Sequence, residues 1–223
     1  MSYVSADPVR AVLDDPHSAA VLVTTVATRG PDHTRLTAER IVTDARRGPW
    51  PEGLLSLTVY TSGDGDSVLT YGQWAGEEWL PTPGAPAEAG VATRAFRHYR
   101  AVRGTAVEEP APVPESFPVA FFPTGDEQSA RAWLDGLLAG EEQAEGDERA
   151  YPGAIAAHLH IAVDGGEVLS FSEWVAEEQA VAHIEAVWAP VLSNFGGTGA
   201  LYRHHRTLLP EPARTPDRSD RPR

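Results

Sequence analysis

The sequence predicts an α+β protein built from two similar modules that follow one another along the chain. The first observation is an internal repeat: residues 53–74 align with residues 153–174 without a gap, and residues 96–100 resemble residues 202–206. The second is the composition, because 42% hydrophobic and 22% charged residues suit a chain that folds around a packed core. The third is an alternation of strand-like and helix-like segments that recurs in both repeats.

The first module begins with a predicted strand. Residues 21–28 are rich in apolar and β-branched side chains, and residues 54–62 have the same character. A helix is expected between them, over residues 32–45. Residues 63–66 read Gly-Asp-Gly-Asp, and these residue types tolerate the positive φ that a hairpin turn needs. The turn therefore leads into a second strand of the same hairpin.

The second module repeats this order. A strand is expected over residues 117–123, followed by a helix over residues 127–142 with apolar side chains at helical spacing. Residues 154–163 and the Asp-Gly-Gly turn at residues 164–166 predict a second hairpin. A further helix is expected over residues 176–188. Each module then has the order β-α-β-β-α-β, which is the ferredoxin-like arrangement.

The two modules differ after the hairpin. In the first, a Pro-rich stretch over residues 81–86 stops any long helix, so a short helical turn and a loop are expected there. We place the modules at residues 18–106 and 115–208, joined by a Pro-rich linker over residues 107–114. Residues 209–223 contain little that could be buried, and a disordered tail is predicted.

Charge and missing residue types exclude several classes of function. The net charge of −14 argues against nucleic acid as a partner. The chain has no cysteine and no lysine, which excludes thiolate chemistry, disulfides and lysine Schiff bases. It also lacks an apolar run long enough to span a membrane and a visible secretory signal, so a cytoplasmic protein without membrane partners is expected.

Residues 168–184 carry a resemblance to a known family. They combine an apolar strand with Glu173, Trp174 and a later His183, and this pattern resembles the strand-to-helix signature of the antibiotic biosynthesis monooxygenase family. The first module has a weaker form, with Gln73 and Trp74. The resemblance implies a dimeric α+β barrel, in which two four-stranded sheets close on one another. A tandem duplication would supply both halves from one chain, as an intramolecular barrel.

The same resemblance implies an activity. Some family members are cofactor-free oxygenases that convert anthrone-like aromatic polyketides into quinones, and others degrade heme. The expected function is therefore a cofactor-independent oxygenase acting on an aromatic polyketide-like small molecule. The alternatives are a non-enzymatic binding protein or degenerate barrel, and a heme-binding or heme-degrading monooxygenase. No cofactor and no metal are assigned, and the protein is expected as a monomer or a homodimer of fused barrels.

Two histidines are the predicted catalytic residues. His158 and His160 lie two apart on a predicted strand, so they project from the same face, toward the barrel interior. Either could be a general base, or both could simply fill the interior. Their counterparts in the first module are Thr58 and Tyr60.

Two tryptophans recur at the same position of the repeat. Trp74 and Trp174 could form an aromatic wall for a flat substrate or belong to the core. Together with Tyr60 and Thr58 they are the predicted substrate-binding residues. Glu173, next to Trp174, could act as a base, but pairing with an arginine is the favoured interpretation.

Overall fold

The computed structural model describes residues 10, 12–81, 89–104, 112–143 and 151–210. Most of the predicted linker over residues 107–114, and the predicted tail beyond residue 210, lie outside these residues. Among the described residues, no helix combines the length and the apolar character needed to cross a bilayer.

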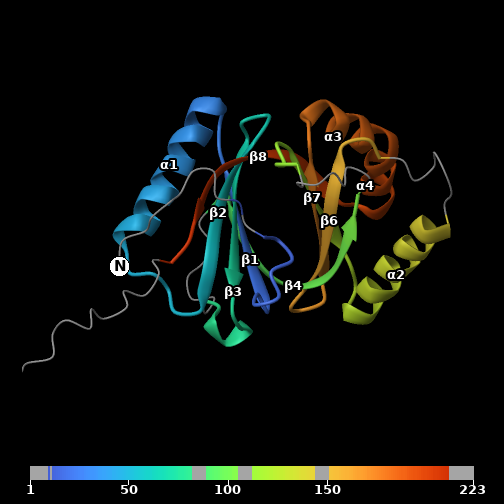
Figure 1. Ribbon diagram of the computed structural model, residues 1–223, viewed down its shortest axis with the longest axis horizontal. Coiled ribbons are helices and arrows are strands. Elements are labelled where there is room, and N and C mark those ends of the chain that lie inside the picture. Colours follow the sequence, from blue (N-terminus) through green and yellow to red (C-terminus); the bar gives the residue numbers. More distant parts are fainter. Residues whose placement is uncertain (1–9, 11, 82–88, 105–111, 144–150, 211–223) are drawn as a thin grey trace, which may run out of the picture.

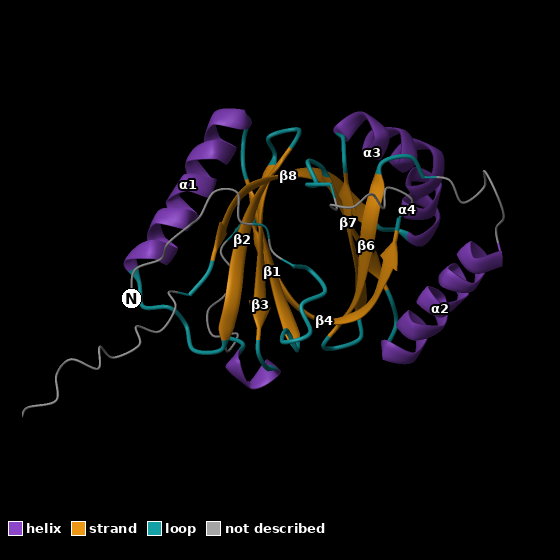
Figure 2. Ribbon diagram, viewed as in Figure 1, coloured by secondary structure: helices purple, strands orange, loops and turns teal. Residues whose placement is uncertain are grey.

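The described strands close into one antiparallel barrel, drawn in orange in Figure 2. Their order around the barrel is β1-β3-β2-β8-β5-β7-β6-β4. Their bounds are β1 Ala20–Ala27, β2 Leu54–Ser62, β3 Ser67–Trp74, β4 Val91–Arg103, β5 Phe117–Pro123, β6 Ala154–Ala162, β7 Glu167–Trp174 and β8 Thr198–Leu208. Closure leaves none of these eight strands with an unpaired edge.

The last strand of each half joins the two halves of the barrel. The first four strands lie in the order β4-β1-β3-β2, and the last four lie in the corresponding order β8-β5-β7-β6. β4 pairs with β6 and β8 pairs with β2, so each long last strand is also paired with the other half. Figure 1 shows β4 and β8 passing between the two groups of strands. The α+β class and the hairpins expected from the sequence are therefore present.

The helices pack on the outer face of the barrel. They are α1 Pro31–Arg47, the short 3₁₀ helix η1 Glu77–Trp79, α2 Glu127–Gln143, α3 Glu177–His183, the π-helical segment η3 Ile184–Trp188 and α4 Ala189–Phe195. α1 covers β2 and β3, α2 covers β6, α3 lies on β7 and α4 on β5 (Figure 1). The helix expected over residues 176–188 is thus found, but it changes to a π-helical turn and continues to Phe195.

The barrel interior is packed with aromatic rings. Tyr60, Tyr71, Phe117 and Phe171 form one buried cluster, with the ring centroid of Tyr60 5.0 Å from Phe117 and 5.2 Å from Phe171. Leu13, from the segment before β1, is only 3% exposed and belongs to the same cluster. The interior is therefore a core that side chains fill, as in other small barrels.

Alternate residues of the same strands pack against the helices. Leu159 and Ile161 of β6 lie against the buried Leu134 and Leu138 of α2. In the other half, Val59 and Val68 pack with Val42 of α1. Each strand thus has an inner and an outer apolar face, which agrees with the alternation in the sequence.

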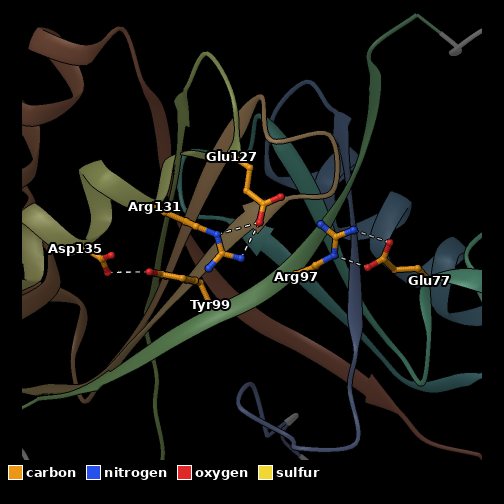
Figure 3. A network of polar contacts seen from close by, with 6 residues as sticks. All are labelled: Glu77, Arg97, Tyr99, Glu127, Arg131 and Asp135. Carbon is orange, nitrogen blue, oxygen red and sulfur yellow. Dashed lines mark hydrogen bonds and ion pairs between the residues drawn. The ribbon is translucent and has the colours of Figure 1, made fainter. Parts of the chain in front are cut away.

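Arg97 and Tyr99 of β4 tie helices of both halves to the barrel (Figure 3). Arg97 makes a two-pronged ion pair with Glu77 of η1. Tyr99 donates its hydroxyl hydrogen to Asp135 of α2, with 2.8 Å between the oxygens, and the guanidinium of Arg131 lies 5.1 Å from the Tyr99 ring centroid. β4 therefore links η1 of the first half to α2 of the second.

Candidate functional site

The two predicted catalytic histidines lie inside the barrel. His158 and His160 on β6 are 2% and 0% exposed, whereas Leu159 between them faces α2. This orientation is the one that their spacing predicts. The Nε2 atom of His160 lies 2.8 Å from the hydroxyl oxygen of Tyr71, so the ring is held by a buried hydrogen bond.

A third histidine completes the interior cluster. The ring centroid of His98 on β4 lies 5.2 Å from that of His160 and 6.0 Å from that of His158. Burial, followed by the charges of the neighbouring histidines, lowers the pKa of His160 well below its usual value, and burial lowers the pKa of His98. Within the described part of the chain, no group of three acidic or histidine side chains is arranged to hold a metal ion.

Glu173 contacts this cluster. Its Oε2 atom lies 3.0 Å from Nε2 of His158, and both side chains are largely buried. The expectation that Glu173 pairs with an arginine is therefore wrong, because β7 directs this side chain to the inner face, where the neighbouring polar group is an imidazole. A carboxylate that hydrogen-bonds one ring nitrogen orients the histidine.

The two counterparts in the first module are also interior residues. Thr58 is fully buried, and its hydroxyl oxygen lies 3.0 Å from that of Thr207 on β8. Tyr60 is 2% exposed, and burial raises its pKa above the usual value, so the phenol keeps its proton at neutral pH. The structure thus brings Thr58, Tyr60, His158 and His160 into one barrel interior. Their functional roles stay predictions.

The two tryptophans lie on the other side of the sheet. Trp174 follows the inward-pointing Glu173, so alternation places it on the outer face, where it packs with Ala154 and with Ala180 of α3. Trp74 is likewise on the outer face, among Ala20, Leu54 and their neighbours. The structure therefore does not bring the tryptophans together with the interior histidines, although the sequence predicts all four as residues of one site.

Trp174 lines a cavity of about 320 Å³ outside the barrel. Its floor is the outer face of β6 and β7, and its walls come from α2, α3, η3 and α4. Its polar and aromatic lining residues are Arg103, Tyr151, Ser170, Ser172, Trp174, His183 and Trp188. A mostly apolar cavity of this size with a few polar groups is the usual form of a small-molecule site.

Aromatic rings surround His183 in this cavity. Its ring centroid lies 4.8 Å from that of Trp174, 4.6 Å from that of Tyr151 and 6.4 Å from that of Trp188. Burial lowers the pKa of His183 to about 4. The imidazole is therefore neutral at pH 7 and has a nitrogen lone pair that can accept a proton from a bound ligand.

The sequence contains a pattern that indicates the helical wall of this cavity. His183, Val187 and Val191 recur at four-residue spacing, which places them on one face of the helical segment, and all three line the cavity. Tyr151 and Trp188 are not among the predicted site residues, and His183 enters the prediction only through the family resemblance.

No protein-family profile matches the sequence, and no curated protein matches it either. Solved structures do match in fold, at low sequence identity. One is an anthrone oxidase-like protein, with 17% sequence identity and a TM-score of 0.60 over 92% of this chain and 95% of that one.

A second similar structure is an uncharacterised ferredoxin-fold protein related to antibiotic biosynthesis monooxygenases, from Listeria monocytogenes 4b F2365. It is 12% identical, with a TM-score of 0.51 over 85% of this chain and 96% of that one. Because both sequence identities are this low, the similarity to these two structures establishes a shared fold only.

Proposed function

We propose that the protein is an oxygenase that oxidises an aromatic small molecule without a cofactor, in the cavity beneath α3. The observation that carries this proposal is the neutral His183, which lies in a cavity with the rings of Trp174, Tyr151 and Trp188 around it. Flat rings suit an aromatic substrate, and the imidazole, unprotonated at pH 7, is in the form that can accept a proton. The likeness in fold to an anthrone oxidase-like protein supports the same chemistry.

In the proposed reaction His183 removes a proton from an acidic carbon or phenol of the substrate. The resulting carbanion or phenolate is electron-rich enough to react with molecular oxygen directly. For an anthrone, one oxygen atom of O₂ becomes the new quinone carbonyl and the other leaves as water, so anthrone and O₂ give anthraquinone and H₂O. The protein then has to bind, deprotonate and shield the anion from water.

We place the site in the second half of the chain. At the matching position of the first half, Trp74 is packed with Leu54, Trp50 and Leu80, so its outer face is covered by the protein's own side chains. The second half instead has the long segment from α3 to α4, which stands over the cavity. His158 and His160 lie on the inner face and line none of this cavity.

We also propose that the two halves arose by tandem duplication of one ferredoxin-like module, over residues 18–106 and 115–208. The corresponding strand orders of the two halves support this. So does a repeated ion pair: Arg97 binds Glu77, and Arg203 binds Glu177 with 2.7 Å between Nε and Oε2. In both pairs the arginine is on the last strand of its half. The glutamate is three residues after the tryptophan that ends the hairpin, Trp74 or Trp174.

Oxygen uptake with 1,8-dihydroxyanthrone tests the proposed function. The wild type is expected to consume oxygen above the spontaneous rate and to form the quinone, and His183→Ala is expected to lose about 100-fold or more of that rate. His17→Ala is the control, because His17 is exposed and outside the cavity. Loss of activity in His158→Ala and His160→Ala, with His183→Ala active, would place the base in the barrel interior. Binding of the anthrone without uptake would favour a binding protein.

A further inference from the structure

A second cavity adjoins the first beneath the same helical segment. It has a volume of about 250 Å³ and lies over the outer faces of β5, β7 and β8. Ser170, Ser172 and Trp188 line both cavities. The two cavities are therefore neighbouring compartments, and Trp188 is the large side chain that lines both.

The two compartments differ in chemistry. The first contains Tyr151, Trp174 and His183, whose rings favour a flat, polarisable ligand. Apart from Trp188, the second is lined by small or aliphatic residues, including Pro118, Ala120, Leu192, Gly199 and Leu201. A saturated hydrocarbon chain matches this second lining, because it offers apolar surface and needs no hydrogen-bond partner.

Trp188 lies at a point where the helix is irregular. It is the last residue of the π-helical segment η3, and Pro190, in the first turn of α4, has no backbone N–H to donate. π-helical turns are rare and occur often at functional sites. The ring of Trp188 lies near those of Phe122 and His183, at centroid distances of 5.5 Å and 6.4 Å.

We propose that the two cavities form one elongated substrate site, and that its ligand is a fused-ring aromatic with a short, unbranched alkyl side chain. The rings lie against Trp174 and His183, and the chain passes Trp188 into the second cavity. This inference rests on the proposed function for the identity of the ring system. Trp188 is then a specificity-determining residue, because it sets the width through which a substituent must pass.

The test is a pair of ligands that differ only in the side chain. The probes are 1,8-dihydroxyanthraquinone and its 3-propyl derivative, which are stable in air, so calorimetry measures binding without turnover. Each buried methylene is worth about fourfold in affinity, so full burial of the three-carbon propyl group is expected to tighten binding to the wild type by roughly 60-fold.

Two variants separate the compartments. Ala120→Leu fills the second cavity and does not line the first, so it is expected to abolish the gain from the propyl group while leaving the affinity for the parent quinone within about twofold. Ala157→Leu is the matched control: Ala157 lines only the first cavity, and this substitution is expected to weaken both ligands. Leu192→Phe fills the second cavity from the helix side and replaces Ala120→Leu if that variant does not fold.

Equal affinity of the wild type for both quinones would overturn this inference, and so would a propyl gain that survives Ala120→Leu and Leu192→Phe in folded protein. Oxygen uptake with the anthrone but no propyl gain would overturn the inference and leave the proposed function standing. A propyl gain that is lost in Ala120→Leu, in a protein that shows no oxygen uptake, would support the inference and overturn the proposed function. Failure of both quinones to bind would overturn both.

Discussion

At the scale of single residues, burial decides how the histidines of this protein behave. His183 lies in an apolar cavity and His160 in the barrel interior, and burial lowers the pKa of both. The consequences differ with the surroundings. His183 faces a cavity that a ligand can enter, whereas His160 is enclosed by Tyr71, His98 and His158 and is hydrogen-bonded to Tyr71.

The pH dependence of activity follows from His183. A base with a pKa of about 4 is unprotonated at neutral pH, so its catalytic form persists as the pH falls and is lost only near pH 4. The kcat/KM for oxygen uptake is therefore expected to show no titration between pH 7 and pH 5.5, with circular dichroism at each pH confirming that the protein is folded. An acidic limb centred between pH 6 and pH 7 would indicate a base with an ordinary histidine pKa instead.

Stability is expected to depend on pH through His160. Its pKa is depressed in the folded state, so below about pH 6.5 the unfolded chain binds a proton that the folded protein does not. Stability is complete above that pH and falls as the pH drops, by at most about 1.4 kcal/mol per pH unit for this group.

Urea unfolding at pH 7.5 and 5.5 measures this loss. The loss is expected to be smaller in His160→Gln than in the wild type, and to be unchanged in His17→Gln, whose side chain is exposed. A loss of the same size in all three proteins would show that His160 is not its source.

At the scale of secondary-structure elements, packing on the outer face fixes the helices. Leu134 of α2 is fully buried against Leu159 and Val168. Truncation to alanine leaves a cavity, so Leu134→Ala is expected to lower the free energy of unfolding by about 2–5 kcal/mol. Leu36→Ala on α1 is the control, because Leu36 is 55% exposed and should change stability by less than about 0.5 kcal/mol. Urea denaturation compares them, and equal effects would contradict this packing.

The sequence predicted the elements better than the site. The strand expected over residues 54–62 is found as β2 Leu54–Ser62, because alternation and turn glycines act locally. The helix over residues 176–188 was predicted as regular, yet it contains a π-helical turn at Ile184–Trp188. The π-helical turn lies where the segment packs over β5 and β7. Local helix propensity contains no information about this tertiary packing.

The candidate site depends on tertiary packing, which one sequence does not specify. The spacing of His158 and His160 correctly predicts that they share one face, but no local pattern indicates which face of β7 carries Trp174. The register of β6 with β7 shifts between Ala154 and Ala156, at the edge of the cavity, and such a bulge changes which residues oppose one another. The cavity then depends on helices brought over the sheet by tertiary packing.

At the scale of the whole molecule, each half needs the other to close the barrel. The pairings of β2 with β8 and of β4 with β6 are the two seams between the halves. Separated halves would expose both β2 and β4, or β6 and β8, as unpaired edges. Fragments 1–107 and 108–223, expressed together, are therefore expected to co-purify in a 1:1 ratio. Recovery of two folded, separate monomers by gel filtration and light scattering would contradict this.

The proposed function requires that the substrate bind outside the barrel, between the sheet and the helical segment from α3 to α4. A crystal structure of the complex with 1,8-dihydroxyanthraquinone tests it most directly. The rings are expected to lie between Trp174 and Trp188, with His183 within hydrogen-bond distance of an oxygen atom on the rings. Rings bound inside the barrel, against His158 and His160, would contradict it.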